Sequence, residues 1–371
     1  MKSPSLSGSR QLGFGFDDAA IPMPTVPPVI ALRTPVPPPP PAATIIAKLV
    51  IETPTEAPAA SPTEAKLPTD VDAETEAMAK VLDAHPDFRV LRRLAPRLEF
   101  PPATGPVATV LVLDTETTGL NAARDKVVEL ALLRVTVDLR TGQPVGAVRV
   151  YDGLEDPGMP MPEEIIAITG ITDDMLRGQR LDEAEVLRLL EGVDLVLAHN
   201  AGFDRPFVES RLPQFAALNW ACSFADIDWK QEGRGSAKLT SLAYDLGFFY
   251  DAHRAEMDCH ALLAVLMASL KTTQASGLSR LIESALNPTF RLQATNAPFD
   301  AKDLLKARGY RWDGPQKVWH TRLGDEAALA LECEWLKSVV YAGRSSRVQI
   351  EELDAKTKYS ARPGKVGWRE L

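Results

Sequence analysis

The sequence VATVLVLDTETTGL, residues 107–120, joins an apolar run to an acidic turn. The run is short, continuous and β-branched, with no Pro or Gly inside it, which predicts a buried strand. Side chains two apart share one face of a strand, so Asp114 and Glu116 point the same way from its carboxyl end. Two such carboxylates repel each other unless a cation lies between them, and Mg²⁺ prefers oxygen ligands. The stretch therefore predicts a metal site, although Asp and Thr are also common at a solvated strand end.

Two later stretches supply further groups of the same kind. HNAGFD ends in Asp204 and follows a second predicted buried strand at 193–198, at the point where a helix begins. HRAEMD begins with His253 and ends with Asp258, at the start of the predicted apolar helix that contains ALLAVLMASL. Each residue has an ordinary alternative: Asp204 as a helix N-cap, Asp258 as a first-turn acid, and His253 as a loop histidine. Each alternative is reasonable for one residue. The chance occurrence of all these residues together in one sequence is improbable, so the alternatives do not explain the whole set.

Four carboxylates and one histidine, each at the edge of an element, resemble the DEDD exonucleases of the histidine-bearing subgroup. This family includes the proofreading epsilon subunit of bacterial DNA polymerase III. The resemblance covers residues 105–272, and Thr169, Gly170 and Ile171 match the family's "TGIT" turn. It implies a ribonuclease-H-like α/β fold, a mixed sheet flanked by helices, and a 3′→5′ exonuclease that releases 5′-mononucleotides.

The resemblance also implies roles for individual residues. Two divalent metal ions, Mg²⁺ or Mn²⁺, are expected on the four carboxylates, Asp114, Glu116, Asp204 and Asp258. Asp114 would bridge both ions, and His253 would be the general base on the attacking water, because imidazole titrates near neutral pH. Contacts to the terminal nucleotide are expected from Thr117, Thr118, Gly119, Leu120, Asn200 and Phe203. His199, and in part Asn200, are expected to shape their loop rather than to do chemistry.

The charge of the chain is distributed unevenly. The chain of 371 residues is long enough for two domains, and its apolar content of 45% is enough for a sizeable core. The net charge is −9. Residues 1–270 carry 24 basic and 38 acidic groups, a net −14, whereas residues 271–371 carry 17 and 12, a net +5. A polyanionic substrate needs local basic help, so the C-terminal region is the candidate to supply it.

The cysteines and the apolar runs bear on the cellular compartment. Cys222, Cys259 and Cys333 form neither a zinc spacing nor a disulfide framework. The first residues lack the apolar core of a signal peptide, and no apolar run is long enough to span a bilayer. We therefore expect a cytoplasmic protein.

The N-terminal part differs in composition from the rest. Residues 1–70 are rich in Pro, Ala and Thr, which predicts a disordered, partly polyproline-II tail. Within it, QLGFGF at 11–16 resembles the glutamine-led peptides by which bacterial replication proteins bind the sliding clamp, although Phe14 and Gly15 depart from the usual pattern. A chance apolar spot is the commoner explanation of so short a motif.

Three further segments are expected after the tail. Residues 71–104 predict a helical arm. Residues 105–272 form the expected exonuclease domain, which begins with a three-stranded antiparallel meander and continues with alternating helices and strands. Residues 288–350 predict a small α+β module and residues 351–371 a basic tail.

Tryptophans and basic residues alternate in the C-terminal module. Trp312 and Trp319 suit stacking on nucleic-acid bases, and the basic side chains interleaved with them suit contacts to phosphate. These basic residues are Arg311, Lys317, His320 and Arg322. The alternative, that the tryptophans form the core of a very small domain, is favoured for at least one of them.

The sequence as a whole predicts a metal-dependent 3′→5′ exonuclease that acts on DNA, in repair or proofreading. An exoribonuclease of the same superfamily is the alternative within the enzyme class, because the five site residues are shared. A tethering or scaffold factor for replication proteins is the alternative from another class, and the complete set of carboxylates argues against it.

Overall fold

The computed structural model describes residues 73–371. The predicted disordered tail and the clamp-binding peptide at residues 11–16 lie outside the described residues, and both stay predictions. Among residues 73–371, no helix is long and apolar enough to cross a membrane.

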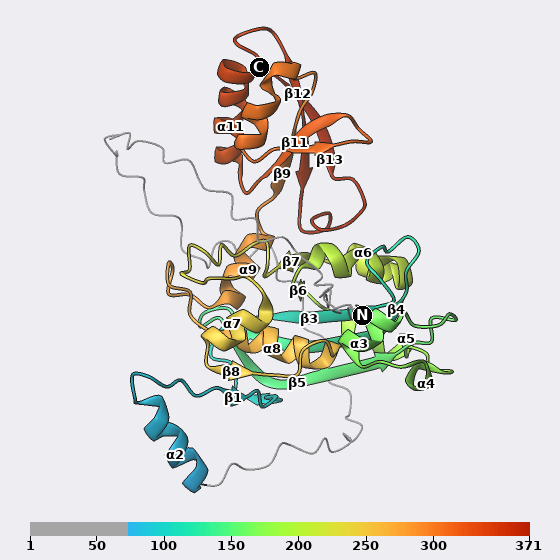
Figure 1. Cartoon of the computed structure of the whole chain (residues 1–371), viewed down its shortest axis with the longest axis vertical. Coiled ribbons are helices and arrows are strands. Elements are labelled where there is room, and N and C mark those ends of the chain that lie inside the picture. The colour runs from blue at the N-terminus through green and yellow to red at the C-terminus, as the bar shows by residue number, and fades with distance from the viewer. Residues whose placement is uncertain (1–72) are drawn as a thin grey trace, which may run out of the picture. The chain divides into compact units, whose positions relative to one another are not determined.

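A six-stranded mixed sheet is the centre of the first domain (Figure 1), with the strand order β2-β5-β4-β3-β6-β7. Strands β3, β4 and β5 pair antiparallel, as the sequence predicts, whereas β6 is parallel to β3 and β7 is parallel to β6. The mixed α/β architecture is therefore confirmed. The strands are β2 (Glu99–Phe100), β3 (Val107–Thr117), β4 (Val127–Asp138), β5 (Gln143–Leu154), β6 (Leu195–Ala198) and β7 (Trp220–Cys222).

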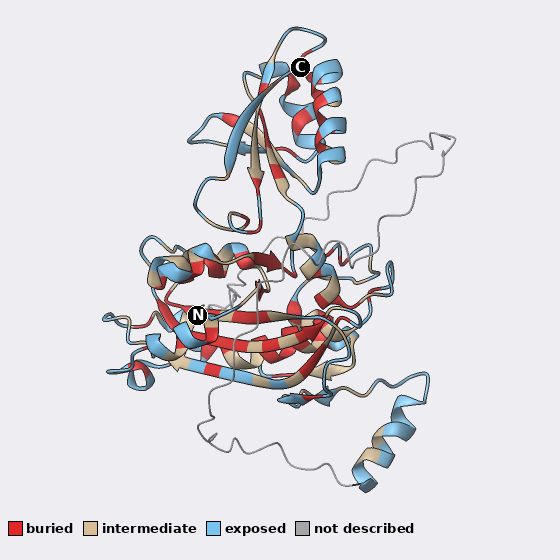
Figure 2. Cartoon of the chain, turned by 180° about the vertical axis from the view of Figure 1, so that it is seen from behind, coloured by how far each residue is buried: buried red, intermediate tan, exposed pale blue. Residues whose placement is uncertain are grey.

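Strand β3 separates two packed layers because its side chains alternate between the faces of the sheet. Val110 and Val112 pack with α7, α8 and α9 on one face, whereas Leu111 and Leu113 pack with α5 and α6 on the other. Figure 2 shows the buried residues concentrated along the sheet and on the helix sides that face it. The helices are α5 (Glu183–Leu190), α6 (Ala201–Arg211), α7 (Leu239–Asp245), α8 (Ala255–Met267) and α9 (Gly277–Ala285).

The "TGIT" stretch forms a tight turn between two short helices. Helix α3 (Glu163–Thr169) ends at Gly170, whose φ of 70° lies in the left-handed region that glycine favours. Thr172 then begins α4 (Asp173–Leu176), and its hydroxyl accepts a hydrogen bond from the Met175 N–H.

The expected helical arm is only partly helical. Helix α2 (Ala73–Asp83) is followed by an extended segment with strand β1 (Arg92–Arg93), which pairs parallel with β8 (Phe248–Phe249). Pro86 and Pro96 explain the difference, because proline cannot continue a helix and disfavours the helical conformation of the residue before it.

The C-terminal part contains a five-stranded antiparallel sheet of order β10-β11-β9-β12-β13. Helices α10 (Lys302–Ala307) and α11 (Glu326–Trp335) cover one face of it. The strands are β9 (Thr289–Ala294), β10 (Arg311–Asp313), β11 (Val318–Leu323), β12 (Arg347–Leu353) and β13 (Lys365–Glu370). The stretch expected as a basic tail, 351–371, thus includes the end of β12 and the whole of the edge strand β13.

Candidate active site

Three carboxylates converge at the carboxyl end of β3. One oxygen each from Asp114, Glu116 and Asp258 lies within 4.8 Å of the other two, and all three residues are half-buried. The alternation of β3 turns Asp114 and Glu116 toward α8, and Asp258 lies in the first turn of that helix. Within residues 73–371 this is the one group of three or more His, Cys, Asp or Glu side chains so arranged.

A tight turn before α8 fixes the Asp258 carboxylate. The Tyr250 hydroxyl donates to one of its oxygens at 2.9 Å, and the backbone N–H groups of His253 and Arg254 donate to the other at 2.8 and 3.2 Å. His253 has a φ of 69°, which aims its N–H at the carboxylate and leaves its side chain exposed. Asp258 is therefore more than a first-turn acid, because its carboxylate organises the turn that carries His253.

Asp204 approaches the group from the other layer. It lies in the first turn of α6, is 2% exposed, and accepts a hydrogen bond from the Thr115 hydroxyl at 2.8 Å. It stays outside the group of three but is close enough to raise the pKa of Asp114. The N-cap of α6 is Asn200, so the alternative of Asp204 as N-cap is wrong.

Sequence reasoning missed a buried ion pair behind the site. Glu129 on β4 lies opposite Glu116, is fully buried, and accepts two hydrogen bonds from the Arg254 guanidinium at 2.8 and 3.0 Å. Its second oxygen accepts from the Ala255 N–H, so the pair ties the start of α8 to the sheet. A single acid inside the apolar run VVELALL was the available signal, because buried carboxylates need partners.

Burial and mutual repulsion raise the pKa values of the site carboxylates. Burial raises the pKa of Asp114 well above its usual range, with added repulsion from Asp204 and Asp258. Burial, with repulsion from Asp258, raises the pKa of Glu116 to about 8, and burial raises that of Asp204 to about 7. A cation among these oxygens would relieve the repulsion, and an all-carboxylate donor set suits a hard divalent ion such as Mg²⁺ or Mn²⁺.

The expected nucleotide-contacting residues divide between exposed and internal positions. Leu120 is 65% exposed beside the site, whereas Thr117 and Thr118 are buried and hydrogen-bond within their own turn. Gly119 leaves room for Asp125, whose carboxylate would lie 2.5 Å from an added Cβ. Phe203 packs on Phe207 in the core.

The HNAGFD stretch has structural roles around α6. The left-handed φ of 70° at Asn200 begins α6, so this residue shapes its loop. His199 is held by Ser223 at 2.7 Å, and burial lowers the pKa of its imidazole to about 4. Pro206 lies in the second turn of α6, which begins at Ala201.

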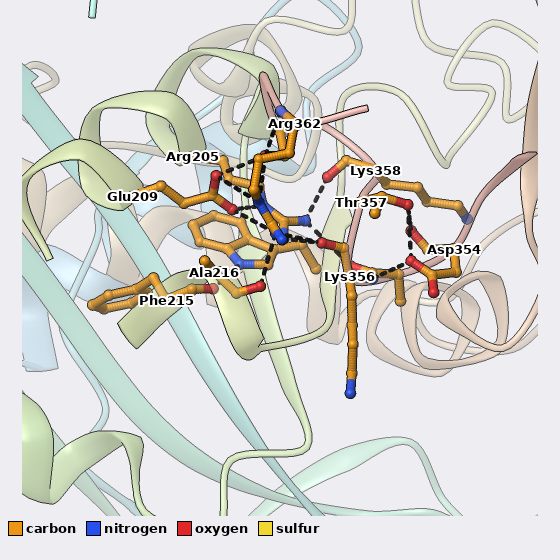
Figure 3. Close-up of polar contacts among 12 residues, drawn as sticks. Arg205, Glu209, Phe215, Ala216, Asp354, Lys356, Thr357, Lys358 and Arg362 are labelled. Atoms are coloured by element: carbon orange, nitrogen blue, oxygen red, sulfur yellow. Dashed lines mark hydrogen bonds and ion pairs between the residues drawn. The ribbon is translucent and has the colours of Figure 1, made fainter. Parts of the chain in front are cut away.

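A fully buried arginine anchors the helix that carries Asp204 (Figure 3). The Arg205 guanidinium donates to the backbone carbonyls of Ala355, Lys356 and Lys358 at 3.2, 2.5 and 2.5 Å, and to the Glu209 carboxylate at 2.6 Å. The three carbonyls belong to the loop between β12 and β13. This loop is therefore part of the support of α6.

A second set of contacts reinforces the same loop. Ser360 and Arg362 both donate to Glu209, and the Tyr359 hydroxyl donates to Asp226 at 2.6 Å. The Trp220 N–H of β7 donates to the Ala355 carbonyl at 2.8 Å. The loop thus contacts both α6 and the edge of the central sheet.

Comparison with known proteins relates the same region to a known family. Residues 111–266 match the exonuclease family model. The DNA polymerase III of PolC type from Bacillus subtilis (strain 168) is 31% identical over 181 residues, which is 46% of this chain and 12% of the relative. Its counterpart from Thermotoga maritima is 31% identical over 186 residues, 47% of this chain and 13% of the relative. The matched region thus spans only a small share of these polymerases.

A solved structure with a likeness to the chain is E. coli exonuclease I in complex with a dA16 oligonucleotide. It is 20% identical over 50% of this chain and 48% of that chain, with a TM-score of 0.37.

Residues 111–266 thus carry both the match to the exonuclease family model and the acidic site. The resemblance of this region to the histidine-bearing DEDD 3′→5′ exonucleases, which include the epsilon subunit of bacterial DNA polymerase III, is confirmed.

Stability without metal should fall as the pH rises. The pKa of Glu116 is about 8 in the folded chain against an ordinary 4.5, so the folded state binds more protons than the unfolded state between these values. The free energy of unfolding therefore decreases as the pH rises through this window. In EDTA the melting temperature should drop between about pH 5 and pH 8, and millimolar Mn²⁺ should restore it, more at the higher pH.

Asp114→Asn is the control for this measurement, because it removes one repelling charge and should weaken both the pH dependence and the response to Mn²⁺. A melting temperature that responds equally to Mn²⁺ at both pH values would contradict the electrostatic account.

Removal of the Arg205 side chain should destabilise the protein strongly. Arg205→Met removes one hydrogen bond from each of three carbonyls and breaks a buried ion pair, which costs about 3–5 kcal/mol in the free energy of unfolding. Arg188→Met is the matched control, because Arg188 pairs only with exposed Glu185 and its loss should cost at most about 0.5 kcal/mol. Urea denaturation compares the two, and equal losses would show that the Arg205 contacts contribute little.

Proposed function

We propose that the protein is a metal-dependent 3′→5′ exonuclease that hydrolyses DNA and releases 5′-mononucleotides. The observation that carries this proposal is the convergence of Asp114, Glu116 and Asp258, with Asp204 beside them. Buried carboxylates at this density are unfavourable in themselves and become favourable around cations. The exonuclease family match supports the same reaction class.

The four carboxylates would hold two divalent ions, Mg²⁺ or Mn²⁺. When bound, such ions neutralise the phosphate and stabilise the attacking and leaving oxygens of an in-line displacement. The chain's own contribution is to fix these carboxylates: Tyr250 and the turn before α8 hold Asp258, and Thr115 holds Asp204.

His253 is proposed as the general base that takes a proton from the attacking water. Its side chain is exposed next to the carboxylate group, while its backbone N–H is fixed on Asp258. An exposed imidazole at the rim can reach a water on the substrate and pass the proton to solvent.

The finer assignments are part of the same proposal. We infer a ribonuclease-H-like topology for the mixed sheet, a domain extending over residues 105–272, and a place in DNA repair or proofreading. An exoribonuclease with the same site is the second candidate, since none of the five residues distinguishes the sugar. The complete carboxylate set disfavours a purely tethering role.

Asp114→Ala should abolish hydrolysis because it removes the carboxylate central to the acidic group. Single-stranded DNA labelled at the 3′ end should release labelled mononucleotide at once in Mg²⁺, and the same strand labelled at the 5′ end should yield a ladder. The variant should show neither and should keep the wild-type circular dichroism. Asp174→Ala, at an exposed ion pair, is the matched control and should keep full activity.

Hydrolysis that persists in Asp114→Ala, or in the presence of EDTA, would contradict the metal-dependent mechanism. Release of the 5′ label first would overturn the direction. RNA degraded faster than DNA would favour the second candidate.

His253→Ala should slow the chemical step by about 10²- to 10⁴-fold at neutral pH, the usual effect of losing a general base. The loss should shrink at high pH, where hydroxide replaces the water that needs a base. Single-turnover rates against pH test this, with the exposed His85→Ala variant as control. Wild-type turnover at neutral pH would make His253 a structural residue.

A further inference from the structure

The two faces of the C-terminal sheet differ in chemistry. Residues that alternate along β10 and β11 lie on opposite faces, so the tryptophans and the basic residues are separated. Trp319 pairs with Ala294 of β9 and packs against the helix-covered core, and Trp312 pairs with Trp319 on that face. Trp319 is half-buried against the core, which fits the alternative favoured for at least one of the two tryptophans.

The opposite face is polar and carries no helix among the described residues. Register places Arg322 beside Arg291 and His320 beside Gln293, with Gln349 on the far side of Gln293. Leu292 and Phe290, the intervening residues of β9, point into the core under the helices. The strand alternation thus puts basic and amide side chains together on an open sheet face.

The loop between β12 and β13 turns this face into a hollow of about 650 Å³. Its charged lining consists of four cations and one carboxylate, Arg291, Lys317, Arg322, Arg362 and Glu351. Amide side chains contribute hydrogen-bond donors and acceptors, namely Gln293, Asn296, Gln316 and Gln349. The net charge of the lining is therefore +3, which is complementary to an anion.

Two of the four cations are free to bind a partner. Arg291 forms ion pairs with Asp313 and Glu351, and Arg362 is engaged with Glu209. Lys317 and Arg322 are exposed, and neither side chain has a hydrogen bond or ion pair within residues 73–371. Unpaired cations at the edge of a polar hollow suit phosphate groups.

We propose that this open sheet face binds a single strand of nucleic acid, with Lys317 and Arg322 on phosphates and the amide side chains on base edges. A single strand exposes base edges that a duplex uses for its own pairs, and amides are suited to bind them. Trp368 of β13 is 53% exposed on the same face, and the Arg347 guanidinium lies over one side of its ring at 4.6 Å, so a base can stack on the other side. The inference shares with the proposed function only the class of substrate, a nucleic-acid strand.

Binding without hydrolysis tests this surface. The full chain in EDTA would be titrated against fluorescein-labelled oligo-dT of about 30 nucleotides, with anisotropy read between about 50 and 200 mM salt. Lys317→Glu with Arg322→Glu should weaken binding at least tenfold at the lowest salt. The slope of log K against log salt should fall by about 1.4, or about 0.7 for each lost phosphate contact. Trp368→Ala should weaken binding about fivefold or more.

The control pair is Lys306→Glu in α10 with Lys337→Glu in the helical turn after α11, which makes the same charge change at exposed lysines whose side chains have no hydrogen bond or ion pair among the described residues. It should change the affinity less than twofold, and melting curves should match for both pairs. Equal effects of the two pairs would overturn the proposal, as would a duplex of the same length that binds as tightly as the single strand. Because no hydrolysis is measured, a chain without exonuclease activity could still bind here, so the two proposals fail separately.

Discussion

Repulsion among half-buried carboxylates is the constraint that shapes the acidic site of the first domain. Three carboxylates meet where β3 ends and α8 begins, namely those of Asp114, Glu116 and Asp258. Burial raises the pKa of each of them. The fold offsets this cost with hydrogen bonds around the group, above all the ion pair between Arg254 and buried Glu129. A divalent cation among these oxygens would relieve the repulsion that remains.

The support of the site reaches well beyond the residues that form it. Asp204 lies on α6, and its neighbour Arg205 fastens that helix to a loop about 150 residues later in the chain. The same loop continues into β13 and closes one side of the basic hollow on the C-terminal sheet. One segment thus contributes to the stability of the acidic site and to the shape of a cationic surface, two features of opposite charge.

The C-terminal part shows how one period in the sequence can be interpreted in two ways. In the sequence, two tryptophans alternate with basic residues, a pattern that suggests one mixed surface for bases and phosphates. These residues are Trp312 and Trp319 with Arg311, His320 and Arg322. The hairpin instead assigns alternate residues to opposite faces, with Trp319 in the core and the arginines on the open side. The two-residue alternation of side chains along these strands could be seen in the sequence. The face of the sheet that the helices cover could not, because tertiary packing places α10 and α11.

The sequence by itself determined the antiparallel meander, the helices after it, and the carboxylates that are proposed as the site. Strand periodicity and a local turn fix Asp114 and Glu116 on one face, and the spacing in HRAEMD fixes Asp258 near a helix start. Only the tertiary structure decided that Asp204 lies outside the group of three and accepts a hydrogen bond from Thr115. It also decided that Glu129 pairs with Arg254, and that Arg205 donates to the carbonyls of a distant loop. These contacts join residues far apart in the chain, and no local pattern encodes them, because each depends on which surfaces the packed layers bring together.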